Sequence, residues 1–190
     1  MISSSRLTVA ANKTRRFLDC LYAAAAVAAA VSLAGIALVM LLQAGMREFG
    51  LLLRGADDIV AWLCAASAFL ALGATFRNGE LVRVSLVLTP LSARARRQAE
   101  TGCLVAALIV AAYATWAISK FVYESWAFKE LAQGLIQIPI WMPQMSLVIG
   151  SAVLLVAVLD ELVAHLRGEK TAYQRAEDER HARKDFSDHL

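Results

Sequence analysis

The four long apolar stretches of this chain contain no charged side chain. They run roughly from Cys20 to Leu42, from Ile59 to Phe76, from Gly102 to Ser119 and from Ile138 to Leu159. Charged groups inside a membrane are costly, and they usually mark an ion path, a proton relay or a substrate site. Their absence argues against a self-contained ion or drug exchanger, which needs a membrane-buried acid.

Histidine and cysteine are equally scarce, with three of each. Cys20, Cys64 and Cys103 lie within or at the edge of the apolar stretches, where a free cysteine packs as a small apolar residue. His165 stands at the end of the last stretch and the other two histidines follow in the tail, so no pair can ligate a membrane haem. The chain also lacks a phosphate-binding glycine loop, an HExxH helix and a GxSxG turn. We therefore expect no enzymatic activity, and no metal or cofactor in this chain.

What the chain has in abundance is apolar residues. They make up 59% of its 190 residues, against roughly 45–50% in soluble domains, and its mean hydropathy is +0.56. Each stretch reaches the ~18 to 20 residues that cross a bilayer, and only helices satisfy their own backbone there. The sequence predicts an all-α integral membrane protein with four transmembrane helices, over 18–43, 59–76, 101–123 and 139–166. A lead-in of residues 1–17 and a charged tail of residues 167–190 flank this membrane domain.

Lysine and arginine are unevenly distributed around these stretches. Fifteen lie in the two tails and the middle loop, against four in the other two loops. Because positive residues are retained in the cytoplasm, we expect both termini and the middle loop to be cytoplasmic. The same clustering beside apolar segments argues against a nucleic-acid partner. The four outer cations are Arg47, Arg54, Lys120 and Lys129.

Three connecting segments are predicted to form short amphipathic helices at the membrane interface. They are Gly45 to Asp58, Phe76 to Pro90 and Phe128 to Ile138. In the first of them, Asp58 falls in the first turn of the second span, where a carboxylate complements the helix dipole. In the middle one, an extended strand is the alternative, and Arg77 and Arg83 can meet lipid phosphates or the acids of a partner.

Two further patterns concern the spans themselves. Ala26, Ala30 and Ala34 recur every fourth residue, which indicates either a helix contact face or alanine richness alone. The pattern of the third helix continues from Ser92 to about Trp126, well beyond the bilayer thickness.

The order of these features resembles the small membrane subunit of tripartite ATP-independent periplasmic (TRAP) transporters, the DctQ/SiaQ type. That family shows Arg-x-Gly-His-hydrophobic-Arg-Val-Asp-Leu after the second span, and this chain has Arg77-Asn78-Gly79-Glu80-Leu81-Val82-Arg83-Val84-Ser85-Leu86. Arg83 comes one residue later than the tightest spacing, Glu80 replaces the histidine region, and Ser85 replaces the aspartate. A role of that aspartate therefore does not carry over.

Two more segments add to the resemblance. Ile138-Pro139-Ile140-Trp141-Met142-Pro143 is similar to the family's start of the last span, and Arg47-Glu48-Phe49-Gly50 followed by Asp57–Asp58 is similar to its basic-aromatic pair and acid. The assembly candidates that follow from these matches are Arg77, Gly79, Arg83, Asp58, Pro139 and Trp141.

The resemblance implies a helper subunit in the bacterial inner membrane. The large membrane subunit of such a transporter carries the substrate and sodium sites, and a periplasmic binding protein delivers the solute, often an organic acid. The small subunit packs against the stationary part of the large one, among membrane lipids, and offers a docking surface outside. The docking candidates in this chain are Arg47, Glu48, Arg54, Lys129 and Glu130.

Two alternatives stay open at this point. The composition and topology are also compatible with the small subunit of another multicomponent carrier, such as the tripartite tricarboxylate type. They are compatible, too, with a free-standing membrane scaffold or signalling protein that works through its charged tail.

The charge distribution predicts the outcome of a topology experiment. An alkaline phosphatase reporter fused after Leu190 should be inactive, because that enzyme needs export, and a reporter inserted near Arg54 should be active. An active reporter after Leu190 would contradict the predicted orientation.

Overall fold

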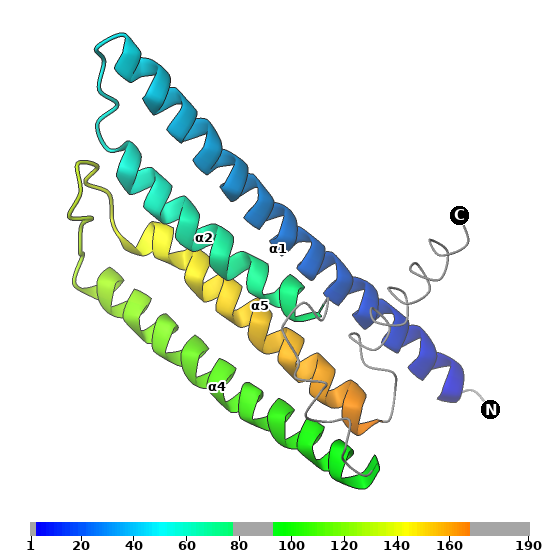
Figure 1. The fold of residues 1–190 in the computed structure, drawn as a ribbon. Helices are drawn as coiled ribbons and strands as arrows, with labels where there is room; N and C mark the ends of the chain where they lie inside the picture. The colour runs from blue at the N-terminus through cyan, green and yellow to red at the C-terminus, as the bar shows by residue number, and fades with distance from the viewer. Residues whose placement is uncertain (1–2, 78–92, 168–190) are drawn as a thin grey trace, which may run out of the picture.

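The computed structural model describes residues 3–77 and 93–167, which form four long α-helices (Figure 1). They are α1 (Ser3–Glu48), α2 (Ala56–Arg77), α4 (Ala93–Ala127) and α5 (Trp141–Leu166). All four are long and apolar enough to cross a membrane. The predicted all-helical architecture with four spans is confirmed, and the described residues include no strand beyond one isolated bridge.

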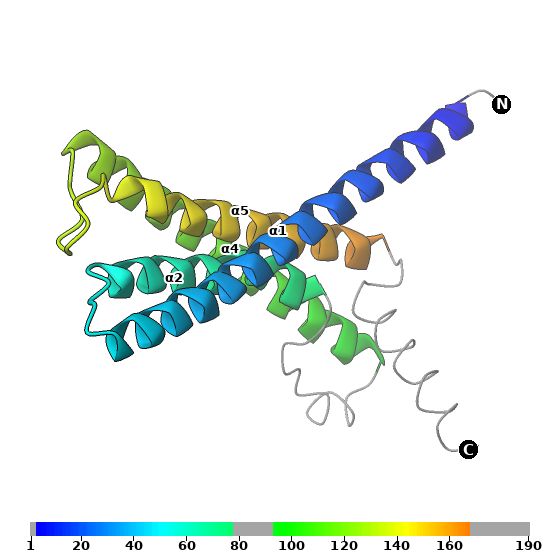
Figure 2. The same cartoon turned by 90° about the horizontal axis from the view of Figure 1, so that it is seen from above.

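Two of the helices are longer than a bilayer requires. α1 has 46 residues and α4 has 35, so they extend roughly 69 and 52 Å at 1.5 Å per residue. The long third helix expected from Ser92 to Trp126 is thereby confirmed. α1 continues back through the predicted lead-in as far as Ser3, and Figure 2 shows its N-terminal part projecting away from the other helices.

The helices form a layer in the order α1, α2, α5, α4 (Figure 1). α5 packs against both α2 and α4, whereas α1 packs chiefly against α2. Each end of the layer holds different parts of the chain. We call the end with residues 49–55 and 128–140 the loop end, and the end with Asp19, Arg77 and His165 the terminal end.

Glycine residues, which have no side chain, allow α2 and α5 to approach closely. A β-carbon built on Gly150 would overlap the backbone carbonyl of Phe69, and one on Gly73 would lie 2.6 Å from a methyl carbon of Val153. Small residues of this kind let helix backbones meet in a bilayer, where van der Waals packing replaces the hydrophobic effect. The α2–α5 contact therefore depends on glycine on both sides.

A hydroxyl group joins α5 to its other neighbour. Thr115 Oγ1 on α4 lies 2.8 Å from the carbonyl oxygen of Ala111 and 3.2 Å from that of Ser151 on α5. Ser151 itself is buried, with 4% of its surface exposed, and its hydroxyl donates to the Val148 carbonyl one turn back. The Ser151 hydroxyl is thus satisfied within its own helix, and its small side chain leaves room for α4 to pack against α5.

The contact face of α1 differs by one residue from the predicted one. Ala25 and Ala29 are buried, whereas Ala30 and Ala34 are exposed. Tyr22 is also buried, and it shows why: the face begins at this aromatic ring near Phe76 and continues in steps of three and four residues. Alanine richness alone offered several such registers, and this one is selected by packing against Phe76 of α2 and against Val153 and Ala157 of α5.

The predicted interfacial helices at the loop end are wrong. α1 continues to Glu48 and stops there, because Gly50 adopts a left-handed conformation (φ 71°) while the Gly50 and Leu51 N–H groups donate to the carbonyls of Arg47 and Met46. This is a Schellman ending. Residues 49–55 then cross irregularly to α2.

The segment after α4 ends its helix in the same way. Lys129 has a φ of 53°, and the Lys129 and Glu130 N–H groups donate to the carbonyls of Trp126 and Ser125. A β-bridge between Leu131 and Pro139 then closes a narrow loop. We call residues 128–140 the strap. The spacing of its apolar residues fits a helix, and the helix prediction is wrong because the bridge holds the strap in a folded-back loop. The predicted helix over 76–90 lies mostly outside the described residues.

Gly150 offers a test of the packing. Gly150→Ala should destabilise the protein in detergent by about 1–3 kcal/mol, the usual cost of overpacking, because the new methyl group has no room against Phe69. Gly102→Ala is the matched control, since a β-carbon there meets nothing within 4 Å. Thermal unfolding followed by circular dichroism measures both, and equal midpoints would contradict the proposed close contact.

Candidate docking and assembly surfaces

The loop end is organised around the carboxylate of Asp58. This residue lies in the first turn of α2, as predicted, and its Oδ2 accepts hydrogen bonds from the backbone N–H groups of Leu135 (2.9 Å) and Ile136 (3.4 Å). Gly134 comes immediately before, and a β-carbon there would overlap the same carboxylate. Asp58 thus connects α2 to the tip of the strap, 77 residues further along the chain.

Shape complementarity supports this connection. Gly55 is buried in a left-handed conformation (φ 84°), and a β-carbon built on it would overlap the side chain of Ile136. Asp57 points elsewhere, since its Oδ1 lies 3.4 Å from Gln43 Nε2 on α1. The two neighbouring carboxylates therefore have different partners, one on the strap and one on α1.

A shallow pocket lies where α4, the strap and α5 meet. The residues that line it are Trp126, Ala127, Lys129, Leu131, Pro139 and Trp141. Its two indole rings sit at helix ends, where the aromatic belts of membrane proteins lie. Pro139 and Trp141 therefore lie together at the start of α5, and Pro143 falls in its first turn, where proline is tolerated.

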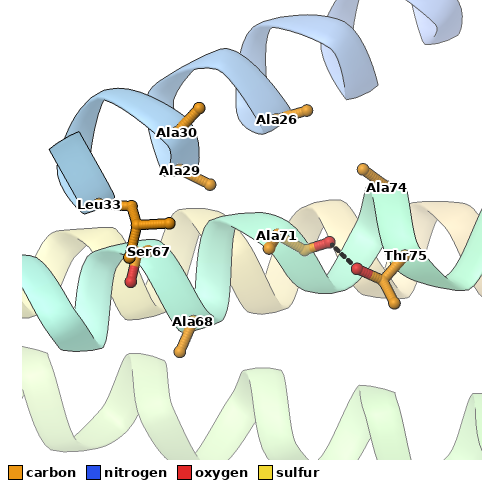
Figure 3. A pocket seen from close by; sticks show the side chains of 9 residues that line it. All are labelled: Ala26, Ala29, Ala30, Leu33, Ser67, Ala68, Ala71, Ala74 and Thr75. Atoms are coloured by element: carbon orange, nitrogen blue, oxygen red, sulfur yellow. Dashed lines mark hydrogen bonds between the residues drawn. The ribbon is translucent and has the colours of Figure 1, made fainter.

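A second hollow, long and lined by small residues, runs between α1 and α2 (Figure 3). Its floor and sides contain only small side chains apart from Leu33, and its hydroxyl groups are satisfied within their own helices: Ser67 donates to the Cys64 carbonyl and Thr75 to that of Ala71. We call it the alanine groove. Its lining residues are Ala26, Ala29, Ala30, Leu33, Ser67, Ala68, Ala71, Ala74 and Thr75.

Arg77 joins α1 to α2 at the terminal end. Its guanidinium pairs with the carboxylate of Asp19 and lies 4.9 Å from the centre of the Tyr22 ring. Both charged side chains are partly exposed, so the pair contributes little beyond fixing the position of Arg77.

A polar cluster joins α4 to α5 at the same end. His165 is buried, with its Nε2 3.1 Å from Thr101 Oγ1 and its Nδ1 4.0 Å from Glu100 Oε2. One turn earlier on α5, Glu161 is also buried, with only 5% of its surface exposed. Sequence reasoning missed this cluster. The available signal was the position of Glu100 and Thr101, which come directly before the apolar part of α4. In the structure both lie beside His165.

Residues 36–168, more than half of the chain, match the protein family described as Tripartite ATP-independent periplasmic transporters, DctQ component. The chain belongs to this family. It is therefore the small subunit of a TRAP transporter and a multi-pass membrane protein, a transporter component and not an enzyme. No curated protein matches the chain. The matched region includes the C-terminal part of α1 from residue 36 onward and all of α2, α4 and α5.

The docking candidates of this DctQ-family subunit all lie at the loop end. Arg47 and Glu48 form the last turn of α1, Arg54 precedes α2, and Lys129 and Glu130 begin the strap. All five are exposed. Large apolar side chains stand among them, with Phe49, Leu52, Phe128 and Leu135 between 73% and 84% exposed.

The assembly candidates, by contrast, are divided between the two ends. Asp58, Pro139 and Trp141 lie at the loop end and Arg77 at the terminal end, while Gly79 and Arg83 lie outside the described residues. Within the described part of the chain, no three histidine, cysteine or acidic side chains are grouped so that they could hold a metal ion.

Proposed function

We propose that this subunit is a stationary scaffold in the bacterial inner membrane for the large TRAP subunit, which carries the solute and sodium sites. The observation that carries the proposal is the single layer of helices. α1 and α4 each have only one main neighbour, so apolar residues along both helices stay uncovered, among them Val31, Leu38, Ile109 and Val110. Such a layer has the surface of a packing element, and its four described helices do not surround an interior that could enclose a solute.

The alanine groove is the surface that fits the large subunit best. Small side chains let a second helix come close, whereas bulky ones keep it away. The opposite edge of the layer is different in kind, because α4 presents Tyr113, Trp116 and Phe121, each more than half exposed. We assign the groove between α1 and α2 to a helix of the large subunit and the aromatic edge of α4 to lipid.

The loop end is proposed to face the periplasm and to dock the binding protein. It has four cations against fifteen elsewhere in the chain, which orients the termini toward the cytoplasm. Its exposed charges are of both signs, and complementary charges of this kind steer encounter and specificity more than they raise affinity. A reversible contact suits a binding protein that arrives loaded and leaves empty. The solute is expected to be an organic acid.

Co-purification tests the scaffold role. With the large subunit co-expressed and extracted in mild detergent, the two chains should elute as one complex. Ala30→Trp, which fills the alanine groove, should reduce the recovered complex several-fold. Val110→Trp on the aromatic edge is the matched control and should leave the yield unchanged. Recovery of this chain as a free monomer would contradict the proposal.

Neutralising cations tests the docking role. In proteoliposomes that contain the whole transporter, Arg47→Gln combined with Arg54→Gln should raise the half-saturating concentration of binding protein several-fold. Higher salt should reduce the difference between variant and wild type, because it screens the lost charges. Arg16→Gln, an exposed cation at the terminal end, is the control. An unchanged half-saturating concentration would show that these cations do not contribute to docking.

A further inference from the structure

The strap is a loop whose tip has few restraints of its own. Its base is held by the left-handed ending of α4 and by the bridge, in which the Ala132 N–H donates to the Ile138 carbonyl and the Ile140 N–H to the Glu130 carbonyl. Beyond that bridge the tip comprises residues 133–137. Leu135 at this tip is 73% exposed, so packing holds it only weakly.

Asp58 supplies a polar restraint on this tip. Its carboxylate accepts the N–H groups of two successive tip residues, Leu135 and Ile136. Among the described residues, no other hydrogen bond joins the strap to α2 or to residues 49–55. A hydrogen bond to an ionised acceptor is roughly twice as strong as a neutral one, so one side chain provides the main polar restraint on this loop.

The restraint matters because it connects two surfaces. The tip carries Leu135, one of the large exposed apolar side chains among the docking candidates, and the segment before Asp58 carries Arg54. These two side chains come from parts of the chain more than 70 residues apart, so they share one surface only while the tip is held against α2. The overlap that any side chain at Gly134 or Gly55 would produce shows how closely the two segments fit.

We propose that Asp58 is the positioning residue that keeps the docking surface of this subunit assembled before the binding protein arrives. The inference rests on the docking role proposed above. With the strap held, the binding protein meets a preformed surface. With the strap released, only a fraction of subunits present that surface at any moment, and the apparent affinity falls by that fraction.

The experiment varies the binding protein against the complete transporter in proteoliposomes. Asp58→Asn keeps the size of the side chain and removes the charge that the two N–H groups bind. It should raise the half-saturating concentration of binding protein about 5-fold or more while the maximal transport rate stays within about twofold, as expected when only the competent fraction changes. Asp57→Asn is the matched control, because Asp57 contacts Gln43 and not the strap, and it should change neither value.

Hydrogen–deuterium exchange supplies the structural readout. Peptides that cover residues 131–138 should exchange faster in Asp58→Asn than in wild type or Asp57→Asn, while peptides from α5 should not change. Unchanged exchange in the strap would overturn the inference. So would faster exchange together with an unchanged half-saturating concentration.

Two further variants complete the test. Gly134→Ala keeps Asp58 and forces the strap away from it, so it should reproduce both effects even where Asp58→Asn yields no assembled complex; if it reproduces neither, the inference is wrong. The Arg47→Gln/Arg54→Gln variant separates the two proposals. If it raises the half-saturating concentration and Asp58→Asn does not, docking stands and positioning by Asp58 is overturned; if neither variant has an effect, the docking role fails.

Discussion

The close approach of α5 to both of its neighbours is the constraint on which the rest of the structure depends. On one side Gly150 meets the backbone of Phe69, and on the other the Ser151 carbonyl meets the Thr115 hydroxyl. Because these residues are adjacent in sequence, they point to different sides of the helix and allow α5 to serve two partners at once. α2 likewise packs between α1 and α5, whereas α1 and α4 at the two edges have one main partner each, so a layer results instead of a closed bundle.

A layer leaves more apolar surface uncovered than a bundle of the same length. In water that would be a liability, but in a bilayer lipid or another membrane subunit covers it at little cost. The same geometry fits spans without internal charge, because the described helices present packing surface to their surroundings along both edges of the layer. Membership in the DctQ family is consistent with the proposed division of labour, in which this subunit acts as a scaffold for the large one.

The two ends of the layer are held by different chemistry. At the terminal end, side chains pair with side chains, Arg77 with Asp19 and His165 with Thr101. At the loop end, a side chain pairs with backbone, since Asp58 accepts two N–H groups of the strap. Bonds to backbone donors position the chain itself, whereas contacts between long side chains leave the backbone free to move.

The sequence by itself determined the number of spans, their helical nature and the absence of charge within them, because hydrocarbon permits so few solutions that apolar length alone decides. It also placed Asp58 in the first turn of α2, from the chain's local pattern. Only the tertiary structure decided what depends on contacts between distant segments: the register of α1 through Ala25 and Ala29, the pairing of Asp19 with Arg77, the burial of Glu161, and the reach of Asp58 to the strap. The strap shows why such contacts could not be predicted from the sequence. Its apolar spacing fits a helix, but a left-handed turn at Lys129 and a bridge to Pro139 fold it back, and nothing local in the sequence reports a bond to a carboxylate 77 residues away.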